Sequence, residues 1–209
     1  MKDEEISLIK KSGENLANVV SETSFELWQT EEFKQMVNFD KISQLEQNRI
    51  FNELLLTALG LFFLHLDHVL KISQTKNQKQ LFKLLQTELY KGFINMFVKL
   101  GIEQKFIDEW KYLVGIRIEE YRKNFKGTYE YSQDIKEMSN EKLKIIWCRV
   151  ETMVISGVSH IRRGKFEEGD LLIASIRKWL IPVDMVFGQI SSIIIHDTPC
   201  IPRGKIAES

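Results

Sequence analysis

Two histidines and an aspartate lie close together in the most apolar part of the chain. His65 and His68 are three residues apart, a spacing that places them on one face of a helix, and Asp67 precedes His68. Two imidazole nitrogens and a carboxylate oxygen are groups that could hold a metal ion. No other segment supplies a matching histidine or cysteine. We therefore expect polar residues at the end of a core helix, with no metal or cofactor, and metal binding by the histidine pair stays the alternative.

The candidate nucleophiles lack the residues that nucleophilic catalysis needs. Ser159 and His160 are adjacent, but the segment 157–160 lacks the second glycine of a Gly-x-Ser-x-Gly turn and lies in an expected helix. Cys148 lies inside an apolar helical pattern, where a free cysteine usually acts as a small hydrophobic residue. An enzyme would therefore have to assemble its site from residues dispersed along the chain.

A short basic cluster surrounds Gly164. It consists of His160, Arg162, Arg163 and Lys165, and four cationic or titratable groups so close together could bind an anion. The alternative is that these side chains follow the end of a helix, where positive charge interacts favourably with the helix dipole. We favour the helix-terminus interpretation and keep the anion site as the second one.

Lysines dominate the segment 71–101, which contains six of them and a single glutamate. Lys76, Lys79 and Lys83 fall on one helical face, where they could follow a phosphate backbone, and Tyr90 could stack on a base. The alternative is a solvated lysine face that keeps the protein soluble. We favour the second interpretation because the chain as a whole carries no net charge.

Composition indicates one ordinary globular domain. The 209 residues are 44% hydrophobic and 28% charged, and lysine plus arginine balance aspartate plus glutamate at 29 each. The two cysteines, Cys148 and Cys200, form neither a metal-binding motif nor a disulfide framework, which favours a reducing, cytoplasmic location. The acidic N-terminus does not resemble a signal peptide, and polar residues interrupt the apolar segment 54–70, so we expect no membrane span.

Helical periodicity covers most of the chain. Proline, the strongest helix breaker, occurs only at positions 182, 199 and 202. Apolar spacing predicts six long helices and, between the first two, a short helical piece bounded by Ser24 and Thr30. The six are at 4–20, 40–72, 78–100, 103–124, 141–163 and 166–181. The last one meets Pro182, where it either ends or kinks and continues towards Gln189. The polar stretch 126–140 is predicted to be the longest loop.

The core is predicted to lie between the second and third of these helices. The segment from Leu54 to Leu66 is apolar nearly all round, as expected of a central helix, and leucines and phenylalanines recur every four residues in the next. We expect these core residues to be buried together: Leu55, Leu59, Phe62, Leu66, Leu85, Leu89, Phe93 and Phe97.

The C-terminal segment 191–209 is predicted to be an extended tail. Ile193, Ile194 and Ile195 form a β-branched run, and the prolines that follow prevent a helix from continuing. Side chains alternate sides in an extended segment, so at least one isoleucine would stay available for a partner. Two outcomes remain open: the tail contacts a partner, or it folds back and covers a groove of its own bundle.

Together these observations predict an all-α protein, an irregular bundle of five or six helices over residues 1–190 followed by a short extended tail. We expect a non-enzymatic interaction module that binds another protein or itself. A nucleic-acid accessory protein that uses the lysine face is the second hypothesis, and an enzyme with a dispersed helical site is the third.

Overall fold

The computed structural model describes residues 3–135, 140–165, 167 and 169–196, with side chains up to Ser191. This part of the chain is all-helical and packs as a bundle, as predicted. It has seven α-helices and one 3-10 turn rather than the five or six helices expected, because Thr30 ends the first helix and caps a separate short one. The helices are α1 (Asp3–Gln29), α2 (Glu31–Met36), α3 (Gln44–Ile72), α4 (Lys76–Lys99), α5 (Gln104–Ser132), α6 (Glu141–Ile161) and α7 (Leu171–His196), and the turn η1 (Phe39–Lys41) precedes α3.

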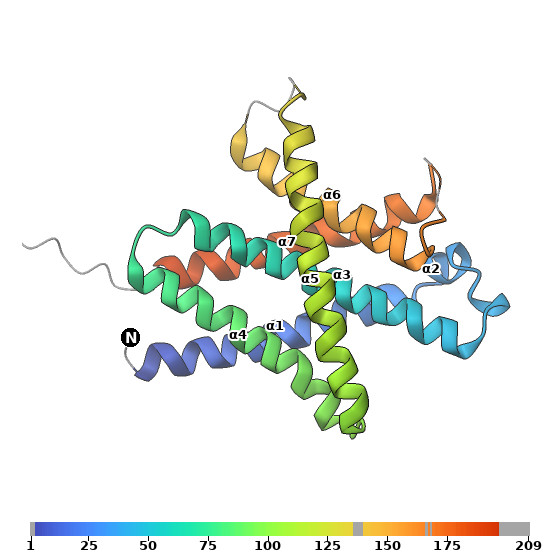
Figure 1. Ribbon diagram of the computed structural model, residues 1–209, viewed down its shortest axis with the longest axis horizontal. Coiled ribbons are helices and arrows are strands. Elements are labelled where there is room, and N and C mark those ends of the chain that lie inside the picture. The colour runs from blue at the N-terminus through green and yellow to red at the C-terminus, as the bar shows by residue number, and fades with distance from the viewer. Residues whose placement is uncertain (1–2, 136–139, 166, 168, 197–209) are drawn as a thin grey trace, which may run out of the picture.

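Helix α3 forms the centre of the bundle, in agreement with the prediction. Every residue from Glu53 to Leu66 is buried, and α3 contacts all the other long helices. In Figure 1, α5 crosses in front of α3 at a steep angle, and α7 runs behind it. Of the eight predicted core residues, seven are buried, and Phe97 is partly buried against the core.

The first and fourth helices pack side by side and in parallel. Gly13 of α1 lies against Glu88 and Leu89 of α4, and one turn later Ala17 lies against Gly92. A Cβ atom at Gly13 would be 2.6 Å from the Cβ of Glu88, so glycine is what allows the two backbones to approach this closely. Both helices therefore begin at the same end of the molecule (Figure 1).

The helix ends follow local sequence signals. Thr75 and Gln78 form a capping box at the start of α4. Gly101 follows its end with a φ of +74°, and Ile102 N donates to Phe97 O at 3.1 Å, as expected for a glycine that terminates a helix. Thr30 caps α2 as predicted, whereas Ser24 lies within α1, which continues to Gln29.

The predicted loop at 126–140 is wrong over its first half, because α5 continues to Ser132. The extra turns are held by contacts with α6: Tyr129 donates a hydrogen bond to Glu141 at 2.5 Å, and the hydroxyls of Thr128 and Thr152 are 3.0 Å apart. Tertiary contacts therefore outweigh the polar composition of this stretch.

The predicted extended conformation is also wrong for residues 191–196, which continue α7 as helix. Pro182 lies inside this helix on its exposed side, where water can bind the carbonyl group that loses its hydrogen bond. Leu180 and Val183, one before and one after the proline, are buried and hold the helix against the bundle on both sides of it. Residues 197–209 lie outside the described residues.

Candidate functional site

A buried polar cluster joins α3, α6 and α7. Arg149 donates two hydrogen bonds, from Nε and Nη2, to the two carboxylate oxygens of Asp184, both at 2.7 Å. His65 Nε2 lies 2.9 Å from Ser191 Oγ, and its Nδ1 lies 3.8 Å from Asp184 Oδ1. Each of the four residues is at most 7% exposed. The cluster is thus the polar connection between α7 and the centre of the bundle.

The charges in this cluster shift the pKa values of its members. Burial raises the pKa of Asp184, but the nearby imidazole of His65 and the two hydrogen bonds from Arg149 outweigh burial and hold that pKa below its usual value. Burial lowers the pKa of His65, and the positive charge of Arg149 acts in the same direction. The cluster is therefore arranged for an ionised aspartate and a neutral histidine.

Ser191, His65 and Asp184 are the residue types that serve as nucleophile, base and orienting carboxylate in a catalytic triad, and His65 lies between the other two. The cavity beside Ser191 and His65 measures about 10 Å³ and is otherwise lined by apolar side chains, among them Leu16 and Phe187. This volume holds about one water molecule and no substrate. The arrangement therefore fixes the position of α7.

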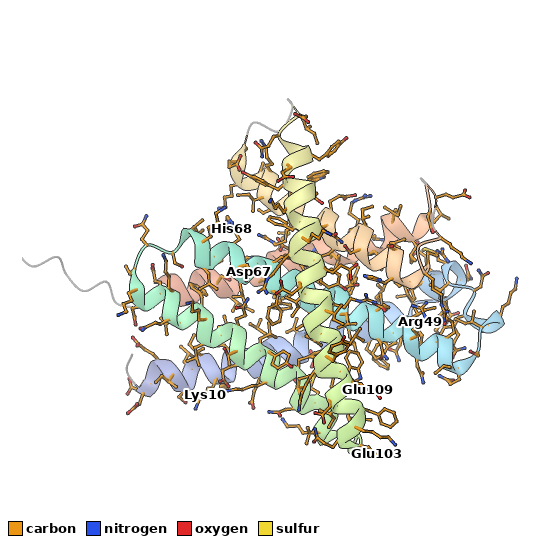
Figure 2. All side chains as sticks on the ribbon, in the orientation of Figure 1. Lys10, Arg49, Asp67, His68, Glu103 and Glu109 are labelled. Carbon is orange, nitrogen blue, oxygen red and sulfur yellow. The ribbon has the colours of Figure 1, made fainter. Side chains whose placement is uncertain are left out.

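The histidine pair and Asp67 do not converge on one point. His65 faces α7, while Asp67 accepts hydrogen bonds from Arg122 at 2.7 Å and from Gln86 at 2.9 Å. His68 is half-buried; Figure 2 labels it and Asp67 near the end of α3. Among the residues that the structure describes, no three histidine, cysteine or acidic side chains are placed to hold a metal ion.

Three members of the predicted anion-binding cluster have carboxylate partners. His160 Nε2 lies 2.9 Å from Glu120, and Arg162 donates to Asp170 at 2.8 and 3.0 Å. Arg163 is paired with Glu46, whose pKa falls to about 2 because Arg49 and Arg163 both donate hydrogen bonds to it. The fourth member, Lys165, is exposed. The positive charge at this corner is thus largely neutralised by partners within the chain.

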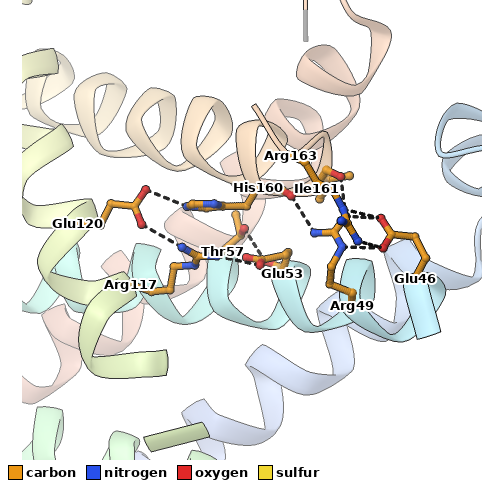
Figure 3. Close-up of polar contacts among 9 residues, drawn as sticks. All are labelled: Glu46, Arg49, Glu53, Thr57, Arg117, Glu120, His160, Ile161 and Arg163. Carbon is orange, nitrogen blue, oxygen red and sulfur yellow. Dashed lines mark hydrogen bonds and ion pairs between the residues drawn. The ribbon is translucent and has the colours of Figure 1, made fainter. Parts of the chain in front are cut away.

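Two of these pairs, His160 with Glu120 and Arg163 with Glu46, belong to a larger charged seam between α3, α5 and α6 (Figure 3). We define the seam as Glu46, Arg49, Glu53, Arg117, Glu120, His160 and Arg163. Arg117 bridges two acids, donating to Glu53 at 2.9 Å and to Glu120 at 3.1 Å. Arg49 donates to the carbonyl oxygens of His160 and Ile161, at 2.8 and 2.7 Å, and thereby caps the C-terminus of α6.

The inner end of the seam contains buried polar atoms that have no hydrogen-bond partner within the described residues. They are Glu53 Oε2, Arg117 Nε and the hydroxyl of Tyr121, which is only 1% exposed. Burial and the nearby carboxylate of Glu53 raise the pKa of Tyr121, so the phenol stays protonated. An acid, a guanidinium and a phenol meet here from two helices, an assembly that no linear motif could indicate.

Cys148 has the environment of a structural residue. Its side chain is buried, and its Sγ lies 3.9 Å from the carbonyl oxygen of Thr128. Burial raises the pKa of the thiol, which disfavours the reactive thiolate.

The lysine face lies along the first half of α4. Lys76, Lys79 and Lys83 are exposed, and the structure gives none of them a carboxylate partner among the described residues. Tyr90 is instead partly buried against the core, so its ring is only partly accessible for stacking. A groove borders this face; it is lined by Ile6 of α1 and by Gln80, Lys83, Leu84 and Thr87 of α4.

The outward side of α7 carries an apolar strip, which we define as Ile181, Pro182, Met185 and Val186. All four are exposed, Met185 most clearly at 63%. Sequence reasoning placed the contact element slightly later, at Ile193, Ile194 and Ile195; these residues continue α7, and their side chains lie outside the described ones.

The chain matches no protein-family model, no curated protein and no solved structure. Within the described residues, α3 is the one helix long and apolar enough to cross a membrane, and 72% of its most apolar window is buried inside the fold.

Proposed function

We propose that this protein is a non-enzymatic helical interaction module, a subunit or adaptor that binds another protein or a second copy of itself. The observation that supports this function is the apolar strip on α7. Ile181, Met185 and Val186 are 46%, 63% and 41% exposed and lie next to one another on the helix. Contiguous exposed apolar residues of this kind mark binding surfaces.

The composition around the strip supports the same function. From Ile181 to Gln189, the exposed residues carry no charge, and the one acid in this span, Asp184, is turned inward to Arg149. Interface centres are depleted in charged residues and enriched in methionine. The cytoplasmic location that we propose agrees with Cys148, a free thiol.

The test is a binding comparison between three forms of the full chain: wild type, the double variant Ile181→Ser/Met185→Ser, and Leu143→Ser. Leu143 is 62% exposed on α6, which makes it a matched control for Met185. Size-exclusion chromatography with light scattering detects self-association, and affinity capture from the native cell with mass spectrometry detects other partners. We expect the strip variant alone to lose the bound species at an unchanged melting temperature. A strip variant that keeps every partner of the wild type would contradict the proposal.

A nucleic-acid accessory function is the second candidate, and the exposure of Lys76, Lys79 and Lys83 on one face favours it. A protein that contacts phosphates in this way loses affinity steeply as salt increases. Titration of labelled RNA and DNA at low and moderate salt, with the triple Lys→Ala variant as comparison, tests this function. Binding that ignores the triple substitution excludes it.

A further inference from the structure

The groove between the first turn of α1 and the second and third turns of α4 combines two apolar side chains with one residue of the lysine face, Lys83. Ile6 and Leu84 are both partly exposed, one from each helix, and they lie in the same groove as the polar side chains of Gln80 and Thr87. Lys83 lines the groove on the α4 side. Because α1 and α4 run parallel, the groove lies where both helices begin (Figure 1).

The exposed lysines on this face of α4, of which Lys83 lines the groove, are available to a partner. Lys91, farther along α4, is paired with Glu88 at 2.8 Å, whereas the structure gives Lys76, Lys79 and Lys83 no such acid within the described residues. The three lysines are three and four residues apart, so they repeat about once per helical turn. A partner helix with acids at the same spacing would meet them in register.

We propose that this groove binds an acidic amphipathic helix of a partner protein. An apolar side chain of that helix packs on Ile6 and Leu84, while its carboxylates face Lys79 and Lys83. The site is separate from the apolar strip of α7, so the chain has two binding surfaces of different chemistry: one uncharged and one cationic.

Two features favour an acidic protein segment over nucleic acid at this site. Ile6 and Leu84 make no favourable contact with a phosphate backbone, but an apolar side chain can pack against them. The first turn of α1 contains the exposed acids Asp3 and Glu4, and it begins at the same end as the lysines. These acids disfavour a continuous polyanion, whereas an amphipathic helix can turn its uncharged side toward them.

The experiment measures fluorescence anisotropy with labelled synthetic probes on the full chain. The first probe is a helical peptide of about 18 residues with a leucine stripe flanked by glutamates at i, i+3 and i+4 spacing. In the second the glutamates become lysines, and in the third the leucines become serines. Single-stranded RNA and DNA are the fourth and fifth probes. We expect the wild type to bind the first probe, with at least about tenfold weaker binding of the second and third.

Protein variants locate the contact. Lys79→Glu/Lys83→Glu should weaken binding of the acidic peptide about tenfold or more, whereas Lys99→Glu, an exposed lysine near the other end of α4, should not. The α7 variant Met185→Ser should bind the peptide like wild type, which separates this site from the proposed function. No binding of the acidic peptide, equal binding of the leucine-free peptide, or indifference to Lys79→Glu/Lys83→Glu would overturn the proposal. Lysine-dependent binding of RNA or DNA alone would assign the face to nucleic acid instead.

Discussion

Arg149 and Asp184 form a bidentate ion pair inside the bundle, with both hydrogen bonds at 2.7 Å and both side chains at most 4% exposed. The pair joins α6 to α7, and neither charge has access to solvent. A buried pair of this kind contributes little against an apolar replacement, but it makes each partner necessary to the other, because either charge left alone would be buried without compensation.

Replacement of Asp184 by alanine should therefore be severely destabilising. We expect a loss of about 3 to 5 kcal/mol in the free energy of unfolding, measured by urea denaturation, because Arg149 would remain buried and unpaired. The double variant Arg149→Met/Asp184→Leu should recover much of this loss. A single variant that unfolds like wild type would show that α7 does not depend on the ion pair.

The central position of α3 predicts a large effect at Leu59, which is 1% exposed. Leu59→Ala should cost about 2 to 5 kcal/mol through lost apolar contacts and the cavity left behind. Leu45→Ala is the control on the same helix, since Leu45 is 80% exposed and should tolerate the change. Similar unfolding midpoints for the two variants would contradict the packing described for α3.

Stability should decrease as the pH falls below about 6.5, the ordinary pKa of histidine. Burial and the charge of Arg149 lower the pKa of His65 and of His68 in the folded state. The two histidines therefore bind protons more readily in the unfolded chain than in the folded protein. Between the pKa of the unfolded chain and the lower pKa of the folded protein, each decrease in pH favours unfolding. Melting temperatures between pH 8 and pH 5 measure this effect. The slope should flatten in His65→Asn/His68→Asn; an unchanged slope would assign it to other groups.

The close approach of α1 and α4 predicts that a larger residue at Gly13 is destabilising, and an open glycine in α5 serves as the control. Gly13→Ala should be destabilising by about 1 to 3 kcal/mol, because the new methyl group would overlap with the backbone and Cβ of Glu88. Gly115→Ala, in α5, meets no atom within 4 Å and should stabilise by up to about 1 kcal/mol through improved helix propensity. Chemical denaturation of both variants checks the opposite signs.

The sequence predicted the helices wherever one strong periodicity controlled them. Leu81, Leu85, Leu89 and Phe93 recur every four residues, and the helix they indicate is present with its glycine end at Gly101. The prediction did not hold where tertiary contacts decided, as in the last turns of α5, nor at the end of α7, which continues as helix beyond residue 190. A proline or a polar stretch lowers local helix propensity, but packing against a neighbouring helix can exceed that local cost.

The polar sites were less predictable than the helices, for a physical reason. Arg149 and Asp184 are 35 residues apart, and Glu53 and Arg117 are 64 apart, so nothing in the local sequence indicates that they pair. By contrast, the exposure of Lys76, Lys79 and Lys83 on one face required only helical spacing. Spacing within one helix can be read from a sequence, whereas partners on different helices depend on the fold.

The parallel packing of α1 on α4 also has a consequence for how the chain folds. It is the most extensive contact between two helices in the described part of the chain, yet the whole of α3 separates the two partners. During synthesis, α1 leaves the ribosome before α4, so the contact between them cannot form until α4 has emerged. Contacts this distant in sequence form slowly, because a long loop must close first. The docking of α1 on α4 is therefore a late step, and a chain halted before α4 would leave the side of α1 around Gly13 and Ala17 open to chaperones or to aggregation.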